Sequence, residues 1–159
     1  MILAPRDPGR CRVVMDGLLS VGIPACLLSA VTAPLQPRGI VLVDEMGVLS
    51  RLYALCRAAY IGGSLVKEGG HNPLEPAAFS KPIFFGPDMS DFMLISKLLK
   101  DHGGTKEIRS EEELTRELDA LLGNRDLQKQ MGKLNHEVFV THSGAVENIV
   151  RNLERLHIV

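Results

Sequence analysis

The sequence has no tryptophan, and aromatic residues make up only 4% of its 159 residues. Proteins that hold single-stranded nucleic acids stack the bases on aromatic side chains, so the composition argues against that class. The formal net charge is −1, from 18 basic and 19 acidic residues spread along the chain. Without a basic block, the chain is not expected to hold a nucleic acid or an anionic membrane by charge alone. An anionic ligand must therefore be bound locally.

Cysteine and long apolar runs are also scarce. The three cysteines, Cys11, Cys26 and Cys56, lie in apolar surroundings without the spacing of a metal site. We expect them to be reduced core thiols, which favours a cytoplasmic location. No apolar run approaches the roughly 20 residues of a membrane helix, and the N-terminus does not resemble a signal peptide. The carboxylates are not clustered as metal ligands, so we predict a soluble domain without a metal or cofactor.

The sequence does contain short apolar runs that alternate with helical patterns, as is typical of βα units around a parallel sheet. The runs are as short as buried parallel strands usually are. Strands are predicted at residues 1–4, 25–29, 39–43, 58–61 and 82–85, with a weaker pattern at 105–108. Helices are predicted at residues 8–21, 48–56, 73–79 and 91–101, where apolar positions recur at three and four residues.

Only helical patterns follow Ser110. Ser110 and Glu113 form a capping box before an apolar stripe, and Asn124 can cap a second helix. A third begins at about Gly144, and its apolar face either packs on the sheet or docks a missing partner domain. A chain of 159 residues is long enough to form one hydrophobic core. We predict one α/β domain over residues 1–159: a Rossmann-like three-layer sandwich with a parallel sheet of about six strands and an all-helical C-terminal part.

The most informative segment is IGGSLVKEGGHNPLEPAAF, residues 61–79, where a strand leads through two glycine pairs into a helix. Asn72 suits the N-cap, Pro73 suits the first helical position, and Glu75 stands where a capping-box carboxylate stands. The free amides at this helix start predict a phosphate-binding site. The flanking glycines would let the phosphate approach the backbone closely. Glu75 can accept hydrogen bonds from a ribose diol. A long turn before a well-capped helix would give the same pattern, and no established nucleotide-binding fingerprint is present.

The string GGSLVKEGGHNPLEPAAFSKPIFFGP, residues 62–87, resembles the signature of transferases of 3-deoxy-D-manno-octulosonic acid (Kdo). These are inverting glycosyltransferases with two facing Rossmann-like domains, the GT-B architecture. APRDPGR at residues 4–10 is similar to the family's Ala-Pro-Arg-His-Pro-x-Arg, and VDEMGVLSRLY at residues 43–53 is similar to its Asp-Thr-Met-Gly-Glu segment. The resemblance spans essentially the whole chain. It implies that the chain is the C-terminal half of a GT-B enzyme that transfers Kdo from CMP-Kdo to lipid A precursor in lipopolysaccharide biosynthesis.

The resemblance also implies which residues bind the donor. In the family the Pro-Arg, Met-Gly and Asn-x-Leu-Glu segments contact CMP. Physical reasoning agrees, because Arg6 can neutralise the leaving phosphate and Met46 can pack on the cytosine ring. Each of these residues also has a plainer explanation. Arg6 would be an ordinary surface arginine, Met46 and Gly47 would form an ordinary βα turn, and His71 would have a structural role in its loop. The predicted donor-binding residues are Pro5, Arg6, Met46, Gly47, Val48, Gly62, Gly63, Ser64, Gly69, Gly70, His71, Asn72, Pro73, Leu74 and Glu75.

The family's catalytic base and lipid acceptor site belong to an N-terminal domain, which this chain lacks, so we name no catalytic residue. We expect the isolated domain to bind CMP or CMP-Kdo weakly and to transfer nothing. The complete enzyme is expected at the cytoplasmic face of the bacterial inner membrane.

The sequence departs from the family pattern at five positions, which puts the transferred sugar and the catalytic efficiency in question. Two alternatives therefore stay open: a GT-B glycosyltransferase that uses a UDP-sugar, and a non-catalytic Rossmann-like nucleotide-binding module. The departures are Asp7 for His, Gly9 for Glu, Glu45 for Thr, Val48 for Glu, and Asp88 for His.

Overall fold

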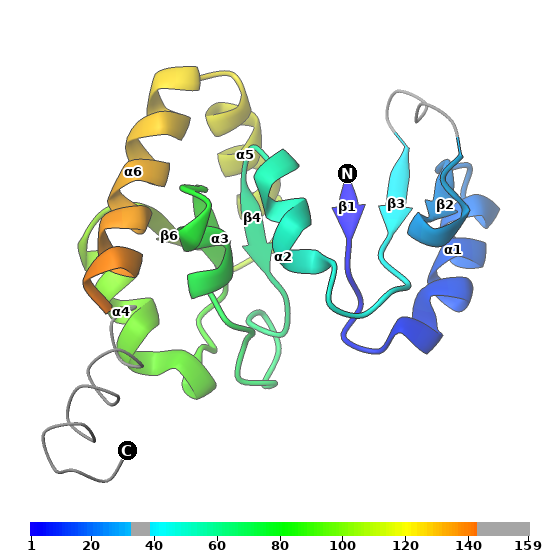
Figure 1. Cartoon of the computed structure of the whole chain (residues 1–159), viewed down its shortest axis with the longest axis horizontal. Coiled ribbons are helices and arrows are strands. Elements are labelled where there is room, and N and C mark those ends of the chain that lie inside the picture. Colours follow the sequence, from blue (N-terminus) through cyan, green and yellow to red (C-terminus); the bar gives the residue numbers. More distant parts are fainter. Residues whose placement is uncertain (33–38, 143–159) are drawn as a thin grey trace, which may run out of the picture. The chain divides into compact units, whose positions relative to one another are not determined.

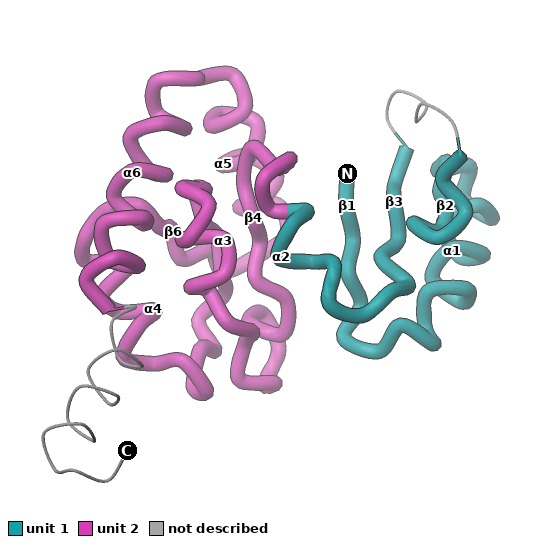
Figure 2. The backbone as a smooth tube through the Cα atoms, in the orientation of Figure 1, with its two compact units in different colours: residues 1–52 teal, residues 53–159 magenta. Residues whose placement is uncertain are grey.

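The structure, a computed structural model, describes residues 1–32 and 39–142. The chain divides into two compact units, unit 1 at Met1–Leu52 and unit 2 at Tyr53–Val159 (Figure 2). Each unit combines parallel strands with helices. The single domain over residues 1–159 therefore stays a prediction.

Six parallel strands lie in the described residues, each inside a segment predicted as a strand (Figure 1). They form two sheets of three strands, with the order β1-β3-β2 in unit 1 and β4-β5-β6 in unit 2. The α/β class and the number of strands are confirmed, but the strands are divided between two sheets where we expected one. The strands are β1 Ile2–Leu3, β2 Ala25–Leu27, β3 Ile40–Leu42, β4 Ala59–Ile61, β5 Ile83–Phe85 and β6 Thr105–Glu107.

The helices also follow the prediction closely, and three of the predicted helices include a short 3₁₀ turn. The all-helical C-terminal part is confirmed for α5 and α6, and the helix predicted from Gly144 lies outside the described residues. The α-helices are α1 Cys11–Ser20, α2 Leu49–Leu52, α3 Leu74–Ala78, α4 Met93–Asp101, α5 Glu111–Leu122 and α6 Arg125–His142. The 3₁₀ turns are η1 Pro8–Arg10, η2 Leu28–Ala30, η3 Tyr53–Leu55 and η4 Ser90–Phe92.

The sheet of unit 2 is covered on both faces, because successive side chains of a strand point to opposite sides. Ile83 and Phe85 of β5 pack in a cluster that includes Leu99 of α4 and Val138 of α6. Phe84, between them, packs instead in a second cluster with α5. Unit 2 by itself is thus a three-layer α/β sandwich.

Unit 1 has its own apolar core between its sheet and α1. Cys11, at the start of α1, packs with Ile40 and Leu42 of β3. Its thiol donates a hydrogen bond to the carbonyl oxygen of Val43 at 3.3 Å, and burial is the main cause that raises its pKa. The prediction of a core thiol is confirmed for Cys11.

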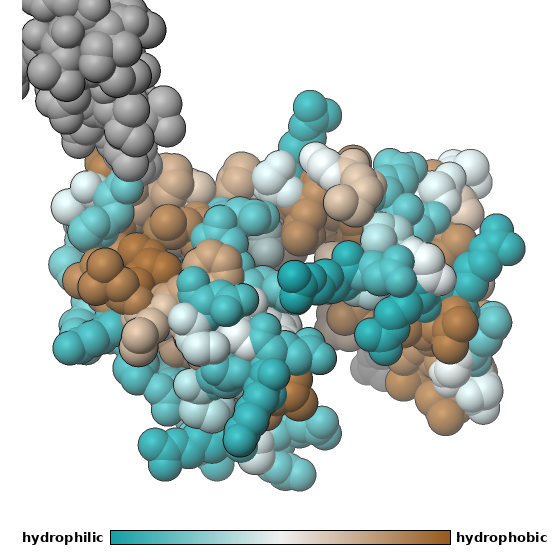
Figure 3. Space-filling model, turned by 90° about the horizontal axis from the view of Figure 1, so that it is seen from below, coloured by the Kyte–Doolittle hydropathy of each residue, from teal (hydrophilic) through white to brown (hydrophobic). Residues whose placement is uncertain are grey.

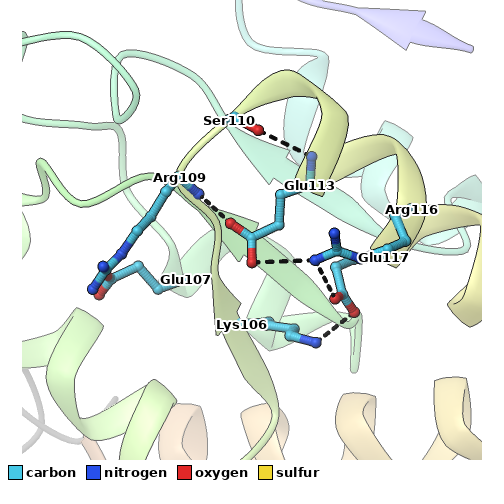
Figure 4. Close-up of polar contacts among 7 residues, drawn as sticks. All are labelled: Lys106, Glu107, Arg109, Ser110, Glu113, Arg116 and Glu117. Atoms are coloured by element: carbon cyan, nitrogen blue, oxygen red, sulfur yellow. Dashed lines mark hydrogen bonds and ion pairs between the residues drawn. The ribbon is translucent and has the colours of Figure 1, made fainter.

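The Ser110 cap predicted at α5 is present, and the Glu113 carboxylate bonds one residue before the N-cap, where a capping box would have it bond to Ser110 itself (Figure 4). The backbone N–H of Glu113 donates to the hydroxyl oxygen of Ser110 at 3.2 Å, and the Glu113 carboxylate accepts from the N–H of Arg109 at 2.8 Å. Arg116 adds an ion pair to the same carboxylate at 3.5 Å. Several unpaired groups of the helix start are therefore satisfied locally, which explains why the sequence alone located this helix.

A buried asparagine joins α6 to the rest of unit 2. Asn135 is fully buried; its side-chain N–H groups donate to the carbonyl oxygens of Lys81 and Gly104 at 2.8 and 2.7 Å. Its own oxygen accepts from the hydroxyl of Thr105 at 2.8 Å. One turn earlier, a Cβ at Gly132 would lie 2.0 Å from a backbone oxygen of the loop before β5, so α6 approaches that loop closely.

Apolar surface remains exposed in both units (Figure 3). On α4 of unit 2, Met93 and Leu94 are 71% and 75% exposed, and on α1 of unit 1 Val13 is 75% exposed. No helix within residues 1–32 and 39–142 is both long and apolar enough to cross a membrane.

Replacing Asn135 by Ala should lower the free energy of unfolding by roughly 3 kcal/mol, because two carbonyl oxygens and a hydroxyl lose their partner inside the protein. Urea denaturation measures the change. Gln130→Ala, at an exposed position of the same helix, is the control and should change it by less than about 0.5 kcal/mol. Equal effects of the two substitutions would contradict the assigned role of Asn135.

Candidate functional site

The loop after β4 is held by a buried hydroxyl. Ser64 is fully buried; its hydroxyl donates to the carbonyl oxygen of Ile61 at 2.6 Å and accepts from the N–H of Gly86 at 2.7 Å. The N–H of Asp88 donates to the Ser64 carbonyl oxygen at 3.0 Å. A Cβ at Gly86 would lie 2.2 Å from that oxygen. We predicted that Ser64 contacts the nucleotide-sugar donor. In the structure its side chain joins the loops that follow β4 and β5.

The second glycine pair of this loop has positive φ angles, +77° at Gly69 and +73° at Gly70, which favour glycine. A Cβ at Gly69 would lie 2.5 Å from the Asp91 carboxyl group, and one at Gly70 would lie 2.5 Å from the Met89 sulfur. We predicted that these glycines leave room for a ligand phosphate. In the structure the neighbouring turn, residues 88–91, fills that space, so the glycines are needed for packing of the chain on itself.

Asp88 fixes the same turn. Its carboxylate accepts hydrogen bonds from the N–H of Gly69 at 2.9 Å and from the N–H of Ser90 at 3.4 Å. The bond from Gly69, followed by that from Ser90, holds the pKa of Asp88 below its ordinary value. The loop after β4 and the turn after β5 are thus tied by backbone and side-chain bonds at both of their ends.

The start of α3 supplies fewer amides than the sequence suggested. The side-chain oxygen of Asn72 accepts from the N–H of Leu74 at 3.1 Å, but the helix begins at Leu74, so Pro73 stands at the N-cap where we predicted Asn72. Pro73 and Pro76 have no N–H. Glu75 therefore carries the one N–H among residues 73–76 that has no partner in the described part of the chain. A phosphate bound here by several helix amides, as we predicted, is not supported by this geometry.

The carboxylate of Glu75 is half-buried and has no hydrogen-bond or ion-pair partner within the described residues. Burial, with the negative charge of Glu75 as the second cause, raises the pKa of Tyr53 to about 12. Glu75 is therefore available to a ligand. An unpaired acceptor at a half-buried position is what a ribose diol would satisfy.

The first glycine pair leads the chain from β4 past His71. A Cβ at Gly62 would lie 3.5 Å from the His71 ring, and Gly63 has a φ of +73°. The structure thus brings Gly62 and His71 together, as a joint site would require. A shallow depression in unit 2 lies beside this loop, lined by residues 65–69, 87–88 and 90–91, and shares Gly69 with the predicted set.

The predicted residues of unit 1 follow two strands of its sheet. Arg6 follows β1 and is exposed, and Pro5 before it is half-buried. Next to them, the Asp7 carboxylate caps the 3₁₀ turn η1 by accepting from the N–H of Gly9 at 2.8 Å. Asp7 therefore has a local structural role that its sequence position did not reveal.

The loop after β3 contains Met46, which is 81% exposed, Gly47 with a φ of +78°, and the half-buried Val48. Asp44 precedes them, and its carboxylate accepts from the hydroxyl of Ser29 at 2.5 Å and from the Ser29 N–H at 3.0 Å. The hydroxyl bond is the main cause that lowers the pKa of Asp44. We did not predict this support for the loop, although an aspartate directly after a strand was a signal for it.

The predicted set is thus divided between the units: Pro5, Arg6 and residues 46–48 belong to unit 1, and residues 62–64 and 69–75 belong to unit 2. Within residues 1–32 and 39–142, no group of three or more His, Cys, Asp or Glu side chains is placed to hold a metal ion.

No protein-family model matches the chain. The chain is 34% identical over 151 residues to the 3-deoxy-D-manno-octulosonic acid transferase of Haemophilus influenzae, a match that covers 94% of the chain and 35% of that protein. It is 32% identical over 160 residues to the transferase of the same name from Rickettsia typhi, which covers 100% of the chain and 33% of that protein.

A solved structure gives the same result. The C-terminal CMP-Kdo binding domain of WaaA from Acinetobacter baumannii superposes with a TM-score of 0.80 and 27% identity, over 86% of this chain and 72% of that one. The chain belongs to the Kdo transferase family. It spans about a third of the length of these curated relatives and has the fold of a GT-B domain.

Two departures from the Kdo transferase pattern now have a physical explanation. Asp7 and Asp88 both replace a histidine that is usual in the family, and both carboxylates accept backbone N–H bonds in the turns that carry them. Each substitution is therefore compatible with an ordered loop. Nothing in the structure explains Glu45 or Val48 in the same way.

The Gly70→Ala substitution should lower the free energy of unfolding by about 1–3 kcal/mol, because Ala is strained at positive φ and its Cβ would contact the Met89 sulfur. Thermal unfolding measures the change. Gly17→Ala is the matched control, since Gly17 lies inside α1 with open space around it. That control should instead stabilise by about 0.5–1 kcal/mol. A neutral Gly70→Ala would refute the packing role of this glycine.

Asp88→Asn should change how stability depends on pH. The folded-state pKa of Asp88 is lowered, so its stabilising contribution is complete above the unfolded pKa, roughly 3.9, and is lost as the pH falls through the folded value. The urea midpoint of the wild type should therefore decrease more steeply below about pH 4 than that of Asp88→Asn. Parallel curves for the two proteins between pH 7 and acidic pH would show that Asp88 makes no such contribution.

Proposed function

We propose that this chain is the donor-binding domain of an inverting glycosyltransferase that takes Kdo from CMP-Kdo. The family membership and the similarity to a CMP-Kdo binding domain support this function. The observation that carries it is the half-buried Glu75 carboxylate, which has no partner in the described residues and follows a loop fixed by Ser64 and Asp88.

In this proposal the predicted residues have distinct roles. Glu75 accepts the hydroxyl groups of the ribose, and Arg6 offsets the negative charge that develops on the leaving CMP phosphate. Met46, Gly47 and Val48 recognise the cytosine. Gly62, Gly63, Leu74 and the remaining predicted residues of unit 2 shape the wall of the site, with Ser64, Gly69, Gly70, Asn72 and Pro73 acting through backbone position.

The complete protein would add an N-terminal domain with the catalytic base and the site for lipid A precursor, and so form the second half of a GT-B enzyme of lipopolysaccharide biosynthesis. Residues 1–159 would form the other half as one Rossmann-like domain. We propose that the enzyme works at the cytoplasmic face of the bacterial inner membrane. We expect residues 1–159 by themselves to bind the donor weakly and to transfer nothing, because the acceptor site and the base would belong to the N-terminal domain.

Calorimetry with CMP, UMP and UDP tests the nucleotide. We expect CMP to bind and Glu75→Ala to weaken it by roughly 1.5–3 kcal/mol, the range for hydrogen bonds to a charged group. Glu111→Ala, on the exposed side of α5, is the control and should leave the affinity unchanged.

Four results would count against the proposal in different ways. Tighter binding of UDP than of CMP would favour a UDP-sugar transferase of the same architecture. Equal binding of all three nucleotides would favour a non-catalytic nucleotide-binding module. Absent binding of all three would overturn donor binding by this domain. Unchanged CMP affinity in Glu75→Ala would remove Glu75 from the site.

A further inference from the structure

Ser29 and Asp44 meet at the carboxyl ends of two neighbouring strands of unit 1. β2 and β3 are parallel, and Leu27 lies opposite Leu42 in their register (Figure 1). Ser29 and Asp44 each come two residues after this pair, so the ladder brings both to the same edge of the sheet. There the Asp44 carboxylate accepts two hydrogen bonds, from the hydroxyl and from the N–H of Ser29. The strand register thus produces a two-bond contact to a charged group.

This contact fixes the start of the loop at residues 45–48. The loop leaves β3 at Asp44, and at its other end the carbonyl oxygen of Val48 accepts from the N–H of Arg51 at 3.1 Å. The N–H groups of residues 45–48 have no hydrogen-bond partner in the described part of unit 1, residues 1–32 and 39–52. Within unit 1, hydrogen bonds therefore hold this loop at its two ends only.

Packing does not hold the middle of this loop. Gly47 has a φ of +78°, and a Cβ placed there would meet no atom within 4 Å. At Gly70, which also has a positive φ, the Met89 sulfur would lie 2.5 Å from such a Cβ. The conformation of residues 45–47 therefore depends on the bonds that Asp44 makes, whereas that of Gly70 is fixed by its neighbours.

We propose that Asp44 and Ser29 are positioning residues of the donor site, whose hydrogen bonds hold residues 45–48 in the conformation that recognises the nucleotide base. This inference rests on the proposed function, in which residues 46–48 recognise the cytosine. Asp44 and Ser29 do not touch the nucleotide themselves. They act by preorganisation, because a loop that already has its binding conformation loses less conformational freedom when the ligand binds.

A fixed loop matters most for the identity of the base. Cytosine presents an amino donor beside a ring-nitrogen acceptor, and uracil presents a carbonyl acceptor beside a ring N–H donor. Backbone N–H and C=O groups distinguish these two patterns only when the loop keeps them in one orientation. Loss of the contact between Asp44 and Ser29 should therefore reduce recognition of the base and spare recognition of the ribose and phosphate.

The order of the loop is measured first, by the heteronuclear NOE of backbone amides in the full chain without nucleotide. In the wild type the amides of residues 46–48 should be as ordered as those of β3. Asp44→Ala should make them mobile, and Ser29→Ala, which keeps the bond from the backbone N–H, should do so to a smaller extent. Ser20→Ala is the control and should leave the loop unchanged, because its hydroxyl bonds within α1, at the end that precedes β2.

Ligand affinity is then measured with the same proteins. Asp44→Ala should weaken the binding of CMP about tenfold and Ser29→Ala about threefold, as expected when a loop must be ordered on binding. Both variants should bind ribose 5-phosphate, which has no base, as the wild type does. The preference for CMP over UMP should decrease in both. Ser29→Thr keeps the hydroxyl group and should restore the affinity for CMP.

Unchanged order of residues 46–48 in Asp44→Ala would overturn the proposal and would show that contacts outside unit 1 hold this loop. A mobile loop with unchanged affinity for CMP would overturn it as well, because the loop would then have no part in recognition. Equal losses for CMP and ribose 5-phosphate would overturn it in favour of a general structural role of Asp44. A wild type whose loop order depends on Asp44 but which binds no CMP would instead overturn the proposed function, and recognition of the base with it.

Discussion

The candidate site of unit 2 depends on the single hydroxyl group of Ser64. Parallel strands end at the same edge of a sheet, so the loops after β4 and β5 start side by side but have no ladder to hold them together. The Ser64 hydroxyl connects them inside the protein, through bonds to Ile61 and Gly86. Being fully buried, it is shielded from competing water. The loop that leads to α3 therefore starts from a fixed point beside the turn after β5.

Other residues of the loop add to the contact that Ser64 makes between the two loops. Gly69 and Gly70 allow the chain to lie directly on the following turn, and Asp88 bonds across the contact. Pro73 and Pro76 carry no N–H, so the start of the short helix offers few free amides. In the donor site that we propose, the Glu75 carboxylate therefore matters more than helix amides.

Much of the fold could be predicted because its signals are local. Apolar runs located all six strands, and the Ser110 capping box located α5, since each depends on neighbouring residues. The division into two sheets was missed, because strand pairing is not encoded in a single segment. The roles of Ser64 and Asp88 were missed for the same reason: their partners lie 22 and 19 residues away in sequence. Of the predicted donor-binding residues, the glycines of unit 2, Asn72 and Glu75 followed from the local pattern, and Pro5, Arg6 and residues 46–48 from the family resemblance.

The environment of Glu75 has one more consequence. Burial first, and then the charge of Glu75, raise the pKa of Tyr53 to about 12, because both oppose a negative phenolate there. A ligand that shields that charge would make the phenol easier to ionise. In a chain with two tyrosines and no tryptophan, the ultraviolet absorbance on alkaline titration should therefore respond to a change at the neighbouring carboxylate.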